Sequence, residues 1–254
     1  MLLSEVDAHR DDVAAITTTA ASDLTTYGNT ILNEAPEKVA GQLRAASTAV
    51  ISTYGETAAV TGALFYETQR PKPGFTAQLA TPSLGETLSS ELGWALVPLF
   101  TPELFELGPA EALNRLGGVT QKYVANMDRQ TVFQAAKKDP TSTGVRWYAS
   151  ANACAFCALM SAQEARTSDP HWHDHCHCVE VPSWDGSPIP DAEYMDEYGR
   201  AASGARQYLM DQHYNHPDYP KFRSDRRFLK AHPELSINNK NLTRVMRERY
   251  GFDH

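Results

Sequence analysis

The sequence predicts a protein of the α+β class that is predominantly α-helical. Its first 70 residues contain many Ala, Thr and Leu residues and few helix breakers. Further along, prolines and glycines separate several helical segments, and two short segments rich in β-branched and aromatic residues flank a cluster of cysteines and histidines. These observations predict a helical N-terminal region, a small Cys/His-stapled α+β module with a short β-hairpin, and a helical C-terminal extension.

The helical N-terminal region is predicted to span residues 1–70 and to contain two helices. Its apolar residues recur at loosely helical spacing, as at Val6, Val13 and Leu24. Pro36 marks the predicted joint, because the residue before a proline is disfavoured in the helical conformation.

A linker and further helices are predicted for residues 71–114. The prolines and the glycine of residues 70–74 predict a loop that runs to Thr81. Thr81 and Thr101 each precede a proline, which is the pattern of an N-cap followed by the first helical residue. The glycine pair at 117–118 predicts the end of the second of these helices.

The α+β module is predicted to span residues 115–183. A helix is expected over residues 119–138, where the Asp-Pro pair at 139–140 ends it. The segments 145–148 and 179–182 are predicted strands, and the cysteine cluster lies between them.

The C-terminal extension, residues 184–254, is predicted to contain a helix over residues 191–213 followed by shorter segments. Residues 221–249 contain nine Lys and Arg residues against three acidic ones, although the whole chain carries a net charge of −8. This split is typical of a tail that contacts an acidic partner, and equally of a solvated helical end with excess arginine.

No apolar stretch is long enough to cross a bilayer, so we expect no membrane association. The N-terminus becomes acidic at Glu5 and Asp7, before a signal-peptide core could form. We therefore expect the protein to be made and kept in the cytoplasm, where thiols stay reduced. That setting favours metal binding or catalysis over disulfides.

All the cysteines lie close together in the chain, and their spacing predicts a structural zinc site. The pair Cys154-x-x-Cys157 is the arrangement that lets two thiolates bind one tetrahedral ion. A second group of cysteines and histidines follows in residues 171–178. Thiolate and imidazole ligands together favour zinc over magnesium or calcium, which prefer oxygen.

The segment offers more ligands than a four-coordinate ion needs. Cys154, Cys157 and Cys178 are the first candidates, and the fourth ligand is either His173 or Cys176. The remaining histidines are then outer partners of the ligands or exposed side chains; they are His171, His175 and His177. Two states without metal stay open, namely four packed reduced thiols or a disulfide pair formed outside the cell.

Known catalytic zinc motifs do not match this segment. Zinc deaminases need His-x-Glu upstream of Pro-Cys-x-x-Cys, whereas here Ala153 precedes the first cysteine. The metalloprotease motif His-Glu-x-x-His is absent as well. We therefore expect no enzymatic activity. The alternative is a metal-dependent nuclease or hydrolase that uses the segment His171–Cys178 with an open coordination position.

The motifs of residues 115–183 together resemble those of the tailed-phage minor head proteins that are similar to the F protein of phage Mu. The resemblance rests on the following residues in order: Arg129-Gln-Thr131, Val145-Arg146-Trp147-Tyr148, Cys154-x-x-Cys157, His173-x-x-Cys176-x-Cys178 and Pro182. Asp174 and His177 stand where that family has proline and arginine. Residues 150–153 lack the family's acidic, arginine-containing turn. The resemblance alone favours His173 over His175 as a ligand.

The resemblance implies a minor capsid protein that is present in few copies inside the phage head, near the portal. It further implies a role in head assembly and in DNA packaging or delivery. The portal protein and other head proteins would be its partners. The resemblance does not cover the N-terminal and C-terminal regions; for a head protein, the basic charge of the segment Lys221–Arg249 is what would direct it to the portal or packaged DNA. A zinc-stabilised adaptor in a bacterial cytoplasm is a third interpretation, which predicts that the chain never co-purifies with capsids.

Overall fold

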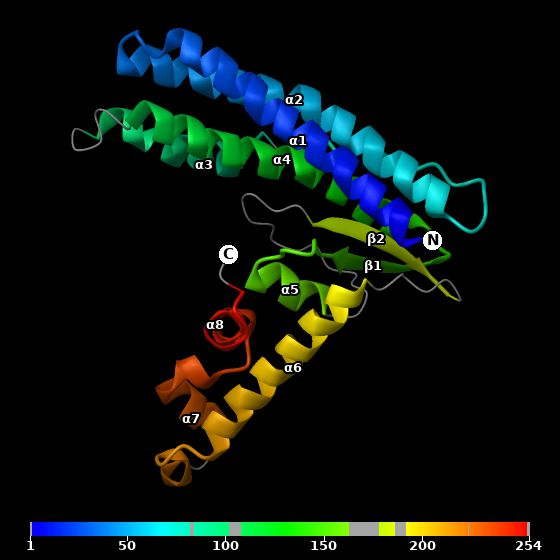
Figure 1. Cartoon of the computed structure of the whole chain (residues 1–254), viewed down its shortest axis with the longest axis vertical. Coiled ribbons are helices and arrows are strands. Elements are labelled where there is room, and N and C mark those ends of the chain that lie inside the picture. The colour runs from blue at the N-terminus through cyan, green and yellow to red at the C-terminus, as the bar shows by residue number, and fades with distance from the viewer. Residues whose placement is uncertain are drawn as a thin grey trace. The chain divides into compact units, whose positions relative to one another are not determined.

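The structure is a computed structural model that describes residues 2–81, 84–101, 108–162, 178–185, 192–222 and 224–252 (Figure 1). Within these residues it contains eight α-helices and a two-stranded antiparallel sheet. The predicted, predominantly helical α+β class is thus confirmed. The chain divides into two compact units, which are Met1–Val145 with Arg166–Ile189, and Arg146–Ala165 with Pro190–His254.

Three long helices, which lie side by side in Figure 1, form most of the first unit. They are α1 (Leu3–Ile31), α2 (Pro36–Gln69) and α4 (Gly108–Lys138). The buried residues of α1 recur three or four positions apart, from Val6 and His9 to Leu24, Gly28 and Ile31, so they form one stripe along the helix. The predicted joint is confirmed, because α2 begins with Pro36 in its first turn.

Close packing of small residues brings the long helices together. A Cβ atom added to Gly62 of α2 would lie 2.7 Å from the backbone oxygen of Asp128 in α4. The apolar core continues to α3 (Glu86–Leu96) and the 3₁₀ turn η1 (Val97–Phe100), where Leu92 packs with Leu43 and Leu116.

Two predicted helix ends are wrong, and tertiary packing explains both. The helix expected to start after Thr81 begins only at Glu86, with Gly85 as its N-cap. Upstream of Thr81, the Ala77 and Ala80 amides donate hydrogen bonds to side chains of α2 and α4, and these contacts with distant helices hold the chain up to Ala80 in a non-helical conformation.

The helix break expected at Gly117 and Gly118 does not occur, because α4 runs through both residues. Two glycines cost a helix about 1 kcal/mol each. Burial of Leu116 and Val119 on either side of the pair offsets this cost. The start predicted at Thr101 cannot be followed, since residues 102–107 lie outside the described residues.

The two predicted strands are confirmed with slightly wider bounds. They are β1 (Ser142–Tyr148) and β2 (Val179–Trp184), and they pair as neighbours in the sheet. The Ser142 hydroxyl donates a hydrogen bond to the backbone oxygen of Ser183 at 3.2 Å, which helps to fix the register at this end. The boundary between the two units falls inside β1.

A buried carboxylate joins the C-terminal ends of α2 and α4. The Asp139 side chain is fully buried and accepts hydrogen bonds from Arg70 Nε at 2.6 Å and from the Tyr66 hydroxyl at 3.0 Å. The backbone N–H and hydroxyl of Thr141 donate to its other oxygen at 3.0 and 2.8 Å. The Arg70 guanidinium holds the pKa of Asp139 well below its usual range, so the carboxylate stays charged.

The second unit is a group of shorter helices. It contains α5 (Ala155–Ser161), α6 (Glu193–Tyr214), η3 (Tyr219–Lys221), α7 (Asp225–Ala231), η4 (Pro233–Leu235) and α8 (Asn239–Tyr250). The helix predicted over residues 191–213 is therefore confirmed as α6. In α8, the Asn238 side chain accepts the Asn241 amide hydrogen, and Gly251 ends the helix in the left-handed conformation. None of the described helices is long and apolar enough to span a membrane.

Candidate functional site

Three of the five predicted zinc ligands lie within the described residues. Cys154 is half-buried immediately before α5, Cys157 is buried in the first turn of that helix, and Cys178 is buried immediately before β2. Cys154 and Cys157 belong to the second unit and Cys178 belongs to the first. His173 and Cys176 lie outside the described residues, as do His171, His175 and His177. The zinc site therefore stays a prediction.

Arg129 of α4 forms a hydrogen bond with Cys178, the last cysteine of the motif set. Helix α4 places this arginine in the interior of the first unit, where it is 1% exposed. Its Nε donates a hydrogen bond of 2.8 Å to the backbone oxygen of Cys178, 49 positions away. A buried guanidinium has lost its hydration, so this bond compensates part of a large desolvation cost.

The other described motif residues also have structural roles. The Thr131 hydroxyl accepts the Ala80 amide hydrogen at 3.0 Å and donates to the Met127 backbone oxygen at 2.8 Å. In the second unit, the fully buried Trp147 ring packs edge-on against Phe156, with ring centroids 5.8 Å apart. These residues therefore hold backbone segments and side chains in place around α4, β1 and α5.

Tyr198 of α6 holds the turn that precedes Cys154. Its hydroxyl lies 2.7 Å from the backbone oxygens of both Ser150 and Ala151 and accepts the Ala153 amide hydrogen at 3.3 Å. The side chain is only 3% exposed. The turn is thereby fixed at three backbone positions, which orients the first residue of the Cys-x-x-Cys pair. No spacing pattern pairs residues this far apart, so sequence reasoning missed Tyr198.

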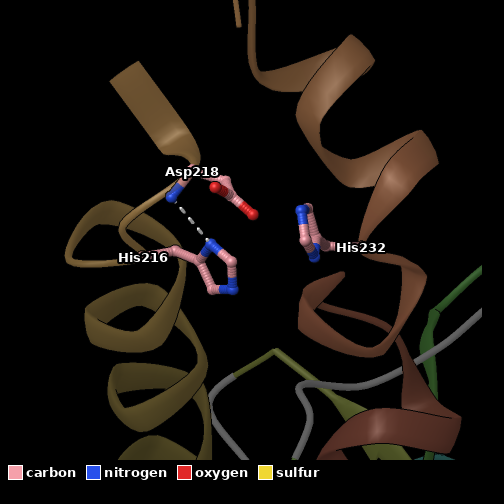
Figure 2. Close-up of side chains that lie close together, drawn as sticks. All are labelled: His216, Asp218 and His232. Carbon is pink, nitrogen blue, oxygen red and sulfur yellow. Dashed lines mark hydrogen bonds between the residues drawn. The ribbon is translucent and has the colours of Figure 1, made fainter. Parts of the chain in front are cut away.

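A second group of potential metal ligands lies after α6. His216, Asp218 and His232 each offer one ligand atom, and these atoms lie within 4.8 Å of one another. Figure 2 shows the three side chains converging, with His216 and Asp218 on one side and His232 on the other. The sequence signal was present as two His-Pro dipeptides with an acidic residue between them, but they indicate helix ends as readily as ligands.

Within the residues that the structure describes, the basic segment 221–249 presents its cations to solvent. Leu242, Val245 and Met246 form the buried face of α8. Its basic residues and those of α7 are exposed or half-buried; they are Arg226, Arg227, Lys230, Lys240, Arg244, Arg247 and Arg249. This surface is positively charged, as the sequence predicts.

Residues 3–202 match the family model described as VG15 protein, and this segment is well over half of the chain. The chain belongs to the VG15 protein family. It is therefore a phage-encoded protein. Comparisons with curated proteins and with solved structures found no match. The part that matches the VG15 model ends within α6, so the His216 group and the basic segment lie beyond it.

Proposed function

We propose that this VG15 protein is a minor head protein of a tailed phage, carried in few copies inside the capsid near the portal. There it acts in head assembly and in the packaging or delivery of DNA. The observation that carries the proposal is the hydrogen bond from Arg129 to the Cys178 backbone. It joins the first residue of the motif set that resembles the Mu F-like head proteins to the last cysteine of that set.

The proposed module contains a structural zinc ion. Cys154, Cys157 and Cys178 would supply three ligands, and His173 or Cys176 the fourth. The spacing of Cys154 and Cys157 supports this assignment, because residues three apart at a helix turn lie on the same face. A zinc ion with four protein ligands has no position for a reactive water, so the proposal assigns the chain no reaction.

The proposed partners are the portal, other head proteins and packaged DNA. Residues 221–249 carry nine basic and three acidic residues, so their net charge is +6 and the rest of the chain carries −14. A mainly acidic surface avoids nonspecific adhesion to DNA, and the basic segment provides one place for contact.

Purified particles test the proposed location. The phage is grown with an epitope tag on this protein, and the heads are treated with protease before and after opening. We expect the tagged protein in DNA-filled heads, protected from protease until the capsid opens, with a tail protein as the accessible control. Absence from purified heads would refute the proposal and favour the cytoplasmic adaptor.

Charge reversal tests the basic segment more cleanly than truncation at Pro220. Truncation would remove α8, which packs on α5 and α6 in the second unit. The double variant Lys240→Glu/Arg247→Glu changes only exposed side chains, and the exposed Lys72→Glu serves as control. We expect the double variant to lower DNA affinity and the salt dependence of binding, and the control to leave both unchanged. Equal DNA binding by all three proteins would remove the proposed contact.

Metal analysis separates the head protein from the nuclease alternative. We expect Cys154→Ser to bind one zinc ion fewer than the wild type, with no cleavage of DNA by either protein in added zinc or magnesium. Metal-dependent cleavage that disappears with a substitution in residues 171–178 would favour the nuclease instead.

A further inference from the structure

We propose that His216, Asp218 and His232 form a zinc-binding site, made of residues other than those of the predicted cysteine site. The three residues come from successive short elements of the second unit. His216 follows α6, Asp218 is the N-cap of η3, and His232 is the C-cap of α7. A shared ion would therefore join the end of α6 to the end of α7.

The donor set suits zinc. Two imidazoles and one carboxylate are common zinc ligands, whereas magnesium and calcium favour oxygen alone. The ligand atoms lie within 4.8 Å of one another, and ligands of a tetrahedral zinc ion lie about 3.4 Å apart. Side-chain movements of roughly 1 Å close this difference. All three side chains are half-buried, so an ion can enter from solvent.

The surrounding side chains orient the two histidines. Both rings pack on Phe228, which is fully buried, with centroid distances of 5.4 Å for His216 and 4.6 Å for His232. The Glu234 carboxylate lies 3.5 Å from His232 Nδ1. A carboxylate at this position favours a proton on Nδ1 and leaves the Nε2 lone pair for a metal, as in many zinc sites.

Two contacts of the proposed ligands compete with metal binding. The His216 Nδ1 atom accepts the Asp218 amide hydrogen at 3.2 Å, so metal binding by this ring costs that hydrogen bond (Figure 2). The Lys221 ammonium donates to the Asp218 carboxylate and lowers its pKa, which keeps the ligand ionised but places a cation beside the site. Removal of the Lys221 charge should therefore strengthen metal binding.

Titration of the purified full-length protein with zinc and with cobalt tests the site. Cobalt bound by thiolates gives a near-ultraviolet charge-transfer band that cobalt bound by histidine and carboxylate lacks, so the two sites are measured separately. We expect the protein to bind cobalt at one site that does not give this band. His216→Ala and His232→Ala should each weaken its binding by more than about tenfold, and Lys221→Gln should strengthen it.

Asp225→Asn is the matched control, because this exposed carboxylate lies in the same segment but outside the ligand set, and its affinity should equal that of the wild type. Circular dichroism without metal identifies folded variants, and Asp218→Asn replaces any histidine variant that fails to fold. Failure of the wild type to bind an ion without the thiolate band would overturn the proposal. Unchanged affinity in the folded ligand variants would do the same. Neither outcome depends on whether the protein enters phage heads.

Discussion

Replacement of Asp139 by asparagine should destabilise the first unit by about 2 kcal/mol at neutral pH. The carboxylate is fully buried and is surrounded by hydrogen-bond donors from Arg70, Tyr66 and Thr141. The isosteric amide keeps the volume but loses the charge and turns an NH₂ group towards these donors. Loss of one partner from a fully buried pair costs about 3–5 kcal/mol. Because Arg70 retains contact with solvent, screening reduces this cost to about 2 kcal/mol.

The pH dependence of this effect follows from the lowered pKa of Asp139. A group whose pKa is lower in the folded state stabilises the protein above its unfolded pKa, which is about 3.9 for aspartate. That contribution is lost as the pH falls towards the folded pKa. The difference in unfolding free energy between wild type and Asp139→Asn should therefore be full at pH 7 and shrink steadily below about pH 4.

Urea denaturation of both proteins at several pH values between 7 and 3 measures this difference. Glu34→Gln is the control, because Glu34 forms an exposed ion pair with Lys38, and its removal should cost less than about 0.5 kcal/mol. A loss below about 1 kcal/mol for Asp139→Asn at pH 7 would contradict the reasoning. So would a difference that stays constant down to pH 3.

Three further substitutions test the contacts described above by thermal denaturation. Arg129→Ala should destabilise by about 3 kcal/mol, because it leaves a cavity and removes the buried hydrogen bond to the Cys178 carbonyl, and a loss under 1 kcal/mol would contradict a structural role. Tyr198→Phe should cost about 1–2 kcal/mol, more than Tyr194→Phe, whose hydroxyl donates a longer hydrogen bond of 3.2 Å to the Ala149 backbone oxygen. Gly62→Ala should cost about 1–3 kcal/mol, because the added Cβ would overlap the Asp128 backbone. Gly41→Ala is the control: its added Cβ would contact no atom, so it should be neutral or stabilising. Equal effects of the two substitutions would refute the close helix contact.

Local patterns predicted the elements whose structure is decided locally. The apolar spacing in α1, the proline that starts α2 and the Asp-Pro pair that ends α4 all act within a few residues. The wrong helix ends near Thr81 and Gly117 have a different origin. There, contacts with distant helices outweigh the local preference, and a single sequence does not contain the partners of those contacts.

The same distinction applies to the candidate sites. The Cys154-x-x-Cys157 pair is a local pattern and was found from its spacing. The bond from Arg129 to Cys178 spans 49 positions, and only the fold of the first unit pairs them. His216 and His232 come together because both rings pack on Phe228, a side chain that hydropathy marks only as apolar.

Experiments can distinguish the two proposed metal sites, because only the cysteine site lies within the segment that matches the VG15 family model. The matched segment ends at residue 202 and contains Arg129 and the predicted cysteine ligands, whereas His216, Asp218 and His232 follow it. A function common to VG15 proteins must reside in the matched segment, so Cys154→Ser should impair entry into heads if the zinc module serves that function. Substitutions of His216, Asp218 or His232 should abolish ion binding at that site and leave the entry of the protein into heads intact. If His232→Ala instead excluded the folded protein from heads, the second site would be part of the assembly function, and that function would extend beyond the matched segment.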